Sequence, residues 1–396
     1  MKHMRKILVL ALSATMLAGV SLFGASQRIE TATAEIAKPS YQQANTKQAS
    51  EGLRFQLSSD GTYYIVTGIG TCKDTDIVIP DTYNGFVVKE IADEAFEYCT
   101  NLTSVAIGNS VTSINDWSFA YCDKLESVTI GDSVKSIGVG CFYSCSKLTS
   151  VTIPDSVTYI GSHVFGYCYS LTSVIIPDGV KNLGKGVFEE CSALTSVVIG
   201  NSVMDIGEAS FYNCTKLTSV TIPDSVKSIG RLAFYNCYRL KSTTIGNGVT
   251  DIDDCAFERC SGLITLTLGD AVVEIGDSAF NKCEKLTELI IPDSVIRIGA
   301  SAFEFCTSLT SVTIGKNVKS IGERAFYYCR SITSMTYKGT KAQWNAVGKG
   351  EDWNQGIILV TEVACVGGCS SVVGLSACLT LMGVGVFMLI KKKDEE

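Results

Sequence analysis

Residues 148–172, LTSVTIPDSVTYIGSHVFGYCYSLT, contain one complete repeat of this chain and the start of the next. The apolar residues change their spacing along the repeat. Val151 and Ile153 alternate with polar residues, which predicts a short strand with one buried face. Val157 and Ile160 follow as a second apolar pair.

The last part of the same repeat has a different spacing. Val164, Phe165 and Cys168 stand at positions i, i+1 and i+4, which predicts one side of a short helical turn. A single coil cannot bury all of its inward side chains, whereas stacked coils can. The repeat therefore predicts a solenoid.

The repeat recurs without a change of length. Each cysteine of the series stands 23 residues after the one before it. A phenylalanine always lies three residues earlier, and a leucine three residues later except at Ile332. The series consists of Cys99, Cys122, Cys145, Cys168, Cys191, Cys214, Cys237, Cys260, Cys283, Cys306 and Cys329. Eleven cysteines in one unbroken register predict one continuous array.

Glycine recurs directly after the second apolar pair, as at Gly161 and Gly230. Asn115 and Asp253 are the exceptions, and these are the residue types that best tolerate positive φ. We therefore expect a left-handed backbone at this position.

The strand pattern followed by a turn resembles leucine-rich repeats, and LTSVTIPDSVKSIG with AFYNC resembles the 23-residue class of BspA-like bacterial surface proteins. The resemblance covers about residues 53–353. It implies an α/β solenoid, a right-handed superhelix with a parallel β-sheet on its concave face and short helical turns on its convex face. It also implies an N-terminal cap at 53–91, repeats at 92–336 and a C-terminal cap at 337–356.

The two ends predict export and anchoring. Residues 1–26 combine basic residues with an apolar stretch, which indicates a signal peptide, with an uncleaved anchor as the alternative. Residues 27–52 read as a flexible stalk and 357–371 as a juxtamembrane spacer. The uncharged run 372–390 precedes three lysines, which predicts a single transmembrane helix, a cytoplasmic tail at 391–396 and an extracellular solenoid on the cell membrane.

Two other interpretations of the C-terminal run remain. It is a buried helix in one, and in the other a processed sorting signal of the Gram-positive type, although the chain has no LPxTG motif.

Catalytic and metal-binding patterns are missing from the sequence, so we expect no enzyme, no cofactor and no metal site. His163 stands alone at a variable turn position, and we expect it on the surface. The repeat cysteines, and Cys141, are expected to be buried as small apolar residues. Cys255 is expected to be exposed, and Cys365 and Cys369 are candidates for a disulfide or a lipid attachment.

Two surfaces are candidates for ligand binding. Of the 22 outward strand positions, 17 are Ser or Thr and only Glu288 is charged, so they form columns of hydroxyls. Ten of the sixteen tyrosines lie within two residues of a repeat cysteine and predict an aromatic stripe. The candidate residues are Thr152, Ser173, Ser196 and Thr221 on the strands and Tyr167, Tyr212 and Tyr235 beside the turns. The alternatives are that the hydroxyl residues are only good strand formers and that the tyrosines cover the edge of the core.

The net charge of −7, without a basic patch along the repeats, argues against nucleic acid as a partner. The first hypothesis is a binding module that contacts an extracellular protein, in adhesion to host, matrix or another cell. The adhesive part follows from the resemblance alone. A glycan ligand, or ice, on the hydroxyl columns and a non-binding structural spacer are the alternatives.

Overall fold

The computed structural model describes residues 48–357 and 364–365. The chain divides into two units, Met1–Pro39 and Ser40–Glu396, and every described residue belongs to the second. The predicted signal peptide, transmembrane run and tail lie outside the described residues, as do most of the stalk and of the juxtamembrane spacer. No helix within the described ranges is long and apolar enough to cross a membrane.

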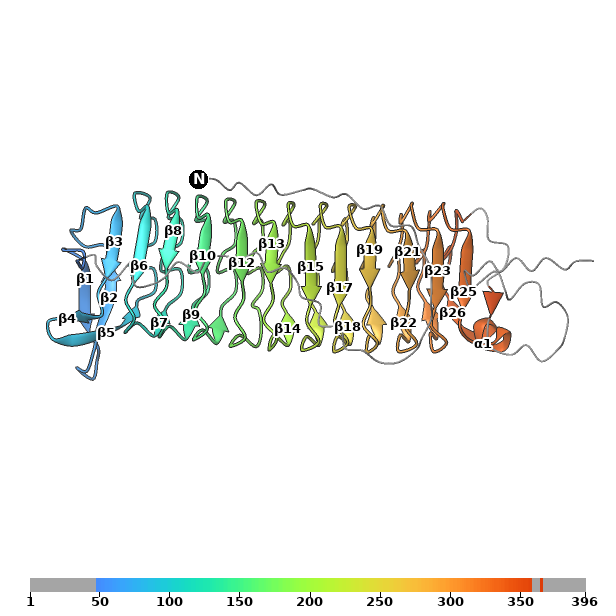
Figure 1. The fold of residues 1–396 in the computed structure, drawn as a ribbon, viewed down its shortest axis with the longest axis horizontal. Coiled ribbons are helices and arrows are strands. Elements are labelled where there is room, and N and C mark those ends of the chain that lie inside the picture. Colours follow the sequence, from blue (N-terminus) through green and yellow to red (C-terminus); the bar gives the residue numbers. More distant parts are fainter. Residues whose placement is uncertain (1–47, 358–363, 366–396) are drawn as a thin grey trace, which may run out of the picture. The chain divides into compact units, whose positions relative to one another are not determined.

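Twelve coils each contribute a strand to a first strand row, which follows the stack along its length (Figure 1). Paired strands of the repeats are parallel and stand 23 residues apart, as Ser150 pairs with Ser127. The parallel stack of short strands predicted from the sequence is confirmed. The row contains β3 (Asp76–Ile79), β6 (Ser104–Ile107), β8 (Ser127–Thr129), β10 (Ser150–Thr152), β12 (Ser173–Ile175), β13 (Ser196–Val198), β15 (Ser219–Ile222), β17 (Ser242–Ile245), β19 (Thr265–Thr267), β21 (Glu288–Ile290), β23 (Ser311–Ile314), β25 (Ser334–Tyr337) and, after the last coil, β27 (Ala364–Cys365).

The second member of the second apolar pair, such as Ile160, lies in a second strand row, which the sequence did not reveal. Most of its strands have only two residues, too few for an alternating pattern. Isolated bridges at Ile160–Leu183 and Asn182–Asp205 join its two halves. The row contains β7 (Ser113–Ile114), β9 (Ser136–Ile137), β11 (Tyr159–Ile160), β14 (Asp205–Ile206), β16 (Ser228–Ile229), β18 (Asp251–Ile252), β20 (Glu274–Ile275), β22 (Arg297–Ile298), β24 (Ser320–Ile321) and β26 (Gly348–Lys349).

The predicted helical turns are wrong. In the repeat quoted above, the segment after β11 is a pair of tight turns, because Gly166 and Cys168 donate backbone hydrogen bonds to the residues three positions earlier. His163 and Tyr167 adopt positive φ angles of 58° and 61°. Their N–H groups donate to carbonyls of the next coil, at Lys185 (2.7 Å) and Glu189 (2.8 Å). The backbone thus bonds between coils rather than along a helix.

The predicted left-handed glycines are also wrong. Gly161 and Gly230 are not among the residues with positive φ. Glycine is favoured there because a Cβ would meet the backbone of the preceding coil. At Gly230 it would lie 2.8 Å from the nitrogen of Glu208 and 2.9 Å from the carbonyl carbon of Gly207. Close approach of two backbones, rather than φ, is therefore the constraint.

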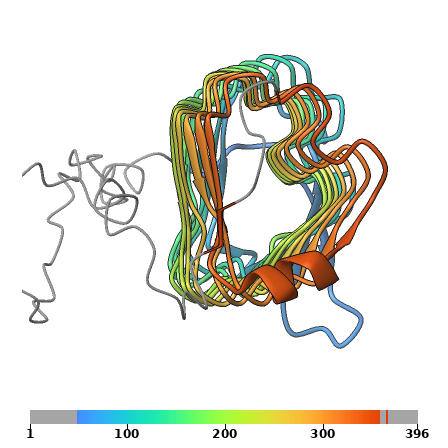
Figure 2. The same ribbon diagram turned by 90° about the vertical axis from the view of Figure 1, so that its right-hand side faces the viewer.

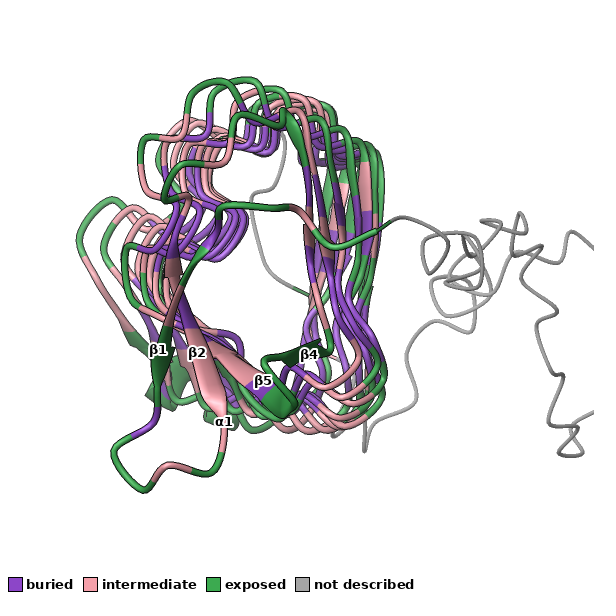
Figure 3. Ribbon diagram, turned by 90° about the vertical axis from the view of Figure 1, so that its left-hand side faces the viewer, coloured by how far each residue is buried: buried purple, intermediate pink, exposed green. Residues whose placement is uncertain are grey.

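The core is a column of phenylalanines running the length of the stack. Consecutive rings from Phe96 to Phe326 stack nearly parallel, with centroids 4.9 to 5.5 Å apart. Each of these side chains is fully buried. Burial follows the inner side of every coil (Figure 3). The inward positions predicted from the repeat are confirmed.

Atypical elements cover both ends of this core. At the N-terminal end, β1 (Arg54–Leu57) pairs antiparallel with β2 (Tyr64–Gly68), and β4 (Thr82–Tyr83) with β5 (Phe86–Ile91). At the other end, α1 (Lys341–Ala346) lies across the last coil (Figure 2). Trp344 of α1 contacts Tyr337 and Trp353, with centroids 5.2 and 5.8 Å apart. Trp353 also contacts Phe326, the last ring of the column, which is fully buried.

Candidate binding surfaces

The four candidate hydroxyls of the first strand row are accessible to a ligand. Thr152, Ser196 and Thr221 are exposed and Ser173 is half-buried. In the described part of the chain, none of these four side chains makes a hydrogen bond. The threonines just before the strands behave differently, since Thr172 Oγ1 donates to the carbonyl of Thr149 at 3.2 Å.

The four predicted hydroxyl residues do not form one continuous group. Ser173 pairs directly with Ser196. The hydrogen-bonded row is interrupted between β10 and β12 and between β13 and β15, which separates Thr152 and Thr221 from that pair. A continuous block lies instead on β15, β17 and β19, where every outward position is an exposed hydroxyl residue. This hydroxyl block consists of Ser219, Thr221, Ser242, Thr244, Thr265 and Thr267.

The predicted tyrosine stripe is present in part. Tyr98 and Tyr121 stack nearly parallel with centroids 4.7 Å apart. Tyr143 contacts Tyr121 at 5.6 Å and Tyr167 at 5.2 Å. These four residues, the N-terminal tyrosine cluster, come from four successive coils. They form an aromatic surface outside the core, and Tyr98 is 62% exposed.

Tyr212 and Tyr235 form a separate pair. Their rings stack at 5.0 Å with an interplanar angle of 5°, and the guanidinium of Arg259 lies 5.7 Å from the Tyr235 centroid. The coil between this pair and Tyr167 carries Glu189 and Glu190 in the equivalent positions. The three candidate tyrosines therefore belong to two surfaces rather than one.

Tyr143, Tyr167 and Tyr235 keep their phenolic protons over the physiological range. Partial burial raises the pKa of Tyr143 to about 12, and it also raises the pKa values of Tyr167 and Tyr235. His163, half-buried beside this cluster, places Nδ1 2.7 Å from Oε1 of Glu189. The surface thus offers neutral O–H donors on apolar rings, a combination enriched in protein interfaces.

A third aromatic group was missed as a site. Phe305, Tyr327 and Tyr328 are in mutual ring contact. Arg324 lies over Tyr327 and Arg330 over Tyr328, at 4.4 and 4.2 Å from the ring centroids. Aromatic residues with arginine are the composition of binding hot spots. A pattern defined by the spacing of tyrosines alone does not include Phe305 or the two arginines.

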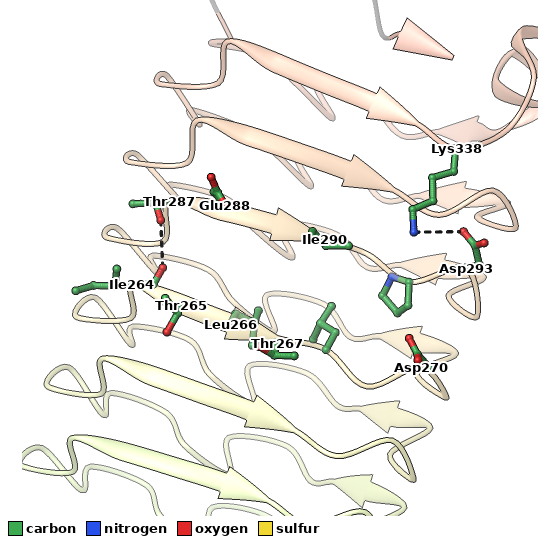
Figure 4. A pocket seen from close by; sticks show the side chains of 12 residues that line it. Ile264, Thr265, Leu266, Thr267, Asp270, Thr287, Glu288, Ile290, Asp293 and Lys338 are labelled. Atoms are coloured by element: carbon green, nitrogen blue, oxygen red, sulfur yellow. Dashed lines mark hydrogen bonds and ion pairs between the residues drawn. The ribbon is translucent and has the colours of Figure 1, made fainter. Parts of the chain in front are cut away.

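A hollow of about 390 Å³ opens on the outer face of the first strand row between β19 and β21 (Figure 4). Its lining combines the apolar Ile264 and Ile290 with Thr265, Thr267 and Glu288. Lys338 lies at one end of the hollow, with its Nζ 3.9 Å from Oδ1 of Asp293. Sequence gave no signal for it beyond Glu288, the one charge at an outward position.

Most of the repeat cysteines are part of the core. Those from Cys122 to Cys329 in the series are free thiols and fully buried, as predicted, together with Cys141, whereas Cys99 is only half-buried. Burial raises the pKa of Cys168 and of Cys237 to about 12. Cys255 is half-buried rather than exposed, and this burial raises the pKa of its thiol to about 12. Cys369 lies outside the described residues.

No group of three or more His, Cys, Asp or Glu residues suited to a metal ion is found in the described ranges.

Comparisons with known proteins agree with this architecture. The model of the BspA type leucine rich repeat region matches in six copies over residues 70–195, 181–287 and 273–345. A leucine rich cell surface protein from Faecalibacterium prausnitzii is 28% identical, with 76% of this chain and 97% of that chain covered and a TM-score of 0.43. A leucine-rich repeat protein from Bacteroides ovatus is 25% identical, with 80% and 100% covered and a TM-score of 0.37.

The leucine-rich-repeat protein of T. pallidum is 26% identical, with 61% of this chain and 90% of that chain covered and a TM-score of 0.38. No curated protein matches the chain. The matched family model covers more than half of the chain and coincides with its coils. The chain therefore belongs to the family of BspA-type leucine-rich-repeat proteins, which are of the bacterial surface-protein type.

Proposed function

We propose that this protein is a cell-surface binding protein that recognises a protein ligand, in adhesion to host, matrix or other cells, through its surface tyrosines. The supporting observation is the N-terminal tyrosine cluster, whose rings pack against one another before any ligand arrives. Ordered rings lose little conformational entropy on binding, so more of the contact energy remains as affinity.

The surface location is part of the same proposal. It rests on the bacterial surface-protein type of the family and on the predicted signal peptide and transmembrane run. A membrane anchor at 372–390 would hold the solenoid outside the cell, where an extracellular partner has access to it.

The test measures binding of the full chain to arrays of matrix proteins. A ligand found in this way is then titrated against the variant Tyr98→Ala/Tyr121→Ala/Tyr167→Ala and against Tyr212→Ala/Tyr235→Ala. At least one variant should lose about 2 kcal/mol of binding free energy, as expected for a hot spot. Tyr159→Ala is the matched control, because Tyr159 is exposed on β11 of the second strand row. Equal binding by all variants would reject the tyrosine surfaces.

A glycan ligand on the hydroxyl block is the second candidate. Its support is the arrangement of six free, exposed hydroxyls on three hydrogen-bonded strands, in parallel register. Strands lie about 4.8 Å apart, so the block offers a periodic set of donors and acceptors to a repetitive ligand. Single hydroxyl contacts contribute little net free energy, and affinity here would have to come from many of them.

A further inference from the structure

The first strand row has an open seam between β19 and β21. Among the described residues, only Thr287 forms hydrogen bonds across this seam. Its N and Oγ1 atoms both donate to the carbonyl oxygen of Ile264, at 3.4 Å. On the far sides the bonds are shorter, at 2.8 Å for Ile264 N to Lys241 O and for Ile291 N to Thr313 O. Each strand is therefore held by its other neighbour, and the hollow lies over the seam (Figure 4).

Apolar side chains line this seam on the outside of the molecule. Ile290 is 62% exposed and Ile264 is 42% exposed, although both are branched aliphatic residues. Leu266 and Pro292 continue the apolar lining toward the core. Exposed aliphatic groups that converge on one hollow mark a site that gains free energy when it is covered.

The rim of the hollow carries carboxylates without a cationic partner. Neither Glu288 nor Asp270 forms an ion pair with another described residue. Asp293, in contrast, forms ion pairs with Lys316 and Lys338, whose Nζ atoms lie 3.8 and 3.9 Å from its carboxylate oxygens. A ligand that brings a positive charge beside Glu288 would therefore be favoured over one that brings a negative charge.

The outward side chains along the seam have the spacing of an extended chain. Thr265 and Thr267 project outward on β19, and Glu288 and Ile290 project outward on β21, each pair two residues apart. Side chains on one face of an extended peptide have the same two-residue period. An apolar side chain over Ile290 would thus place the residue two positions away beside Glu288.

We propose that the hollow between β19 and β21 binds an extended peptide segment of a partner protein, with an aliphatic side chain against Ile264 and Ile290 and a Lys or Arg two residues away beside Glu288. The inference rests on the proposed binding role but uses a surface separate from the tyrosines. Thr265 and Thr267 supply hydroxyls to the peptide backbone.

The test uses the full chain on an array of immobilised nonapeptides. Each peptide fixes one leucine among threonines and varies the residue two positions away through all amino acids. Lys and Arg at the varied position should give at least tenfold more binding than Asp and Glu. Glu288→Lys should reverse this preference, and Ile290→Ser should reduce binding of all peptides at least tenfold.

Val198→Ser is the matched control, since Val198 is 52% exposed at the equivalent outward position of β13. Binding without preference for basic residues, absence of binding, or an equal loss in Val198→Ser and Ile290→Ser would overturn the proposal. If one of these outcomes is found while ligand binding still depends on the tyrosines, the peptide site in the hollow is rejected and the tyrosine surfaces are not. Lysine-selective peptide capture without any effect of the tyrosine variants would reject the tyrosine surfaces alone.

Discussion

The thiol of Cys214 donates a hydrogen bond to the backbone carbonyl of Phe188, with Sγ 3.2 Å from the oxygen. The same bond reaches back 26 residues in every repeat from Cys122 to Cys329. The carbonyl of Phe188 also accepts from the nitrogen of Cys191, at 3.2 Å. Cysteine thus supplies a second donor to a buried carbonyl while remaining nearly apolar.

This relationship predicts the order of stability of two variants. Cys214→Ala removes the donor and leaves a void, so we expect a loss of about 1–2 kcal/mol of unfolding free energy. Cys214→Ser keeps a donor and should lose less. Urea melts of the full chain measure both, with Cys255→Ala, outside the column, as a control that changes stability by less than about 0.5 kcal/mol. A greater loss in Ser than in Ala would mean that the thiol serves only as apolar volume.

The buried thiols predict alkaline instability. Burial raises the pKa values of nine repeat cysteines, from Cys122 to Cys306, above their ordinary value of 9.0. Below pH 9 both states are protonated and the stability is complete. Above pH 9 the unfolded chain loses thiol protons that the folded chain keeps, so the free energy of unfolding falls as pH rises toward the folded pKa.

Each such proton contributes about 1.4 kcal/mol per pH unit to this slope. Cys237→Ala removes one group whose folded pKa is about 12. Between pH 9 and 12 the free energy of unfolding of the variant should therefore fall less steeply with pH, by the contribution of one proton, or about 1.4 kcal/mol per pH unit. Urea melts at several pH values give the slopes. Identical slopes for the variant and the parent would show that Cys237 does not take part.

Phe211 tests the phenylalanine column. Its ring is fully buried between Phe188 and Phe234, with centroids 5.4 and 5.0 Å away. Phe211→Ala should cost about 3–5 kcal/mol, because the rings on both sides cannot close the cavity. Since each coil contacts only its neighbours, we also expect the denaturant transition to lose cooperativity at this repeat. The exposed Tyr238 serves as the control, and Tyr238→Ala should melt like the parent.

Gly230 tests the close approach of coils. Gly230→Ala places a Cβ 2.8 Å from the nitrogen of Glu208 and should destabilise the chain by more than about 1 kcal/mol. Asp253 occupies the equivalent position of the next coil and already has a Cβ, so Asp253→Ala should have a smaller effect. A left-handed backbone would instead make Gly230→Asn nearly neutral. We expect Asn to destabilise at least as much as Ala.

The sequence predicted those features that depend on one repeating side chain. Phe211 and Cys214 stand at fixed intervals, so burial of one member implies burial of all. The same pattern could not distinguish a helical turn from two tight turns, because both place Val164, Phe165 and Cys168 on the inner side. The left-handed residue stands at His163, two positions after Gly161. Residue type gave no signal there, since hydrogen bonds to the next coil impose the conformation.

The binding surfaces were predictable only in part for a different reason. Tyr167, Tyr212 and Tyr235 are all near a repeat cysteine, but the spacing alone does not say which rings touch. The hollow beside Ile290 depends on missing bonds between two strands, and strand separation is a property of the backbone rather than of a motif.

The hydroxyl columns make a prediction about where substitutions matter. Thr152, Ser173, Ser196 and Thr221 lie across two interruptions of the row, and changing all four to Lys spreads the disturbance over separate groups. Changing Thr221, Thr244 and Thr267 to Lys instead disrupts one column of the continuous block.

If a glycan lies on this block, the triple variant should lose more affinity than the quadruple variant despite having fewer changes, because its ligand contacts are adjacent and act together. Both should keep the parental urea midpoint, since these side chains make no hydrogen bonds in the described part of the chain and are exposed except for the half-buried Ser173. Glycan arrays probed with the full chain, followed by titration of any bound sugar, measure the difference. A larger loss in the quadruple variant would place the contact near Thr152, Ser173 or Ser196, away from the block. Unchanged binding of every ligand by these variants, by the tyrosine variants and by Ile290→Ser would leave a structural spacer as the better account, since no proposed contact would then contribute free energy to recognition.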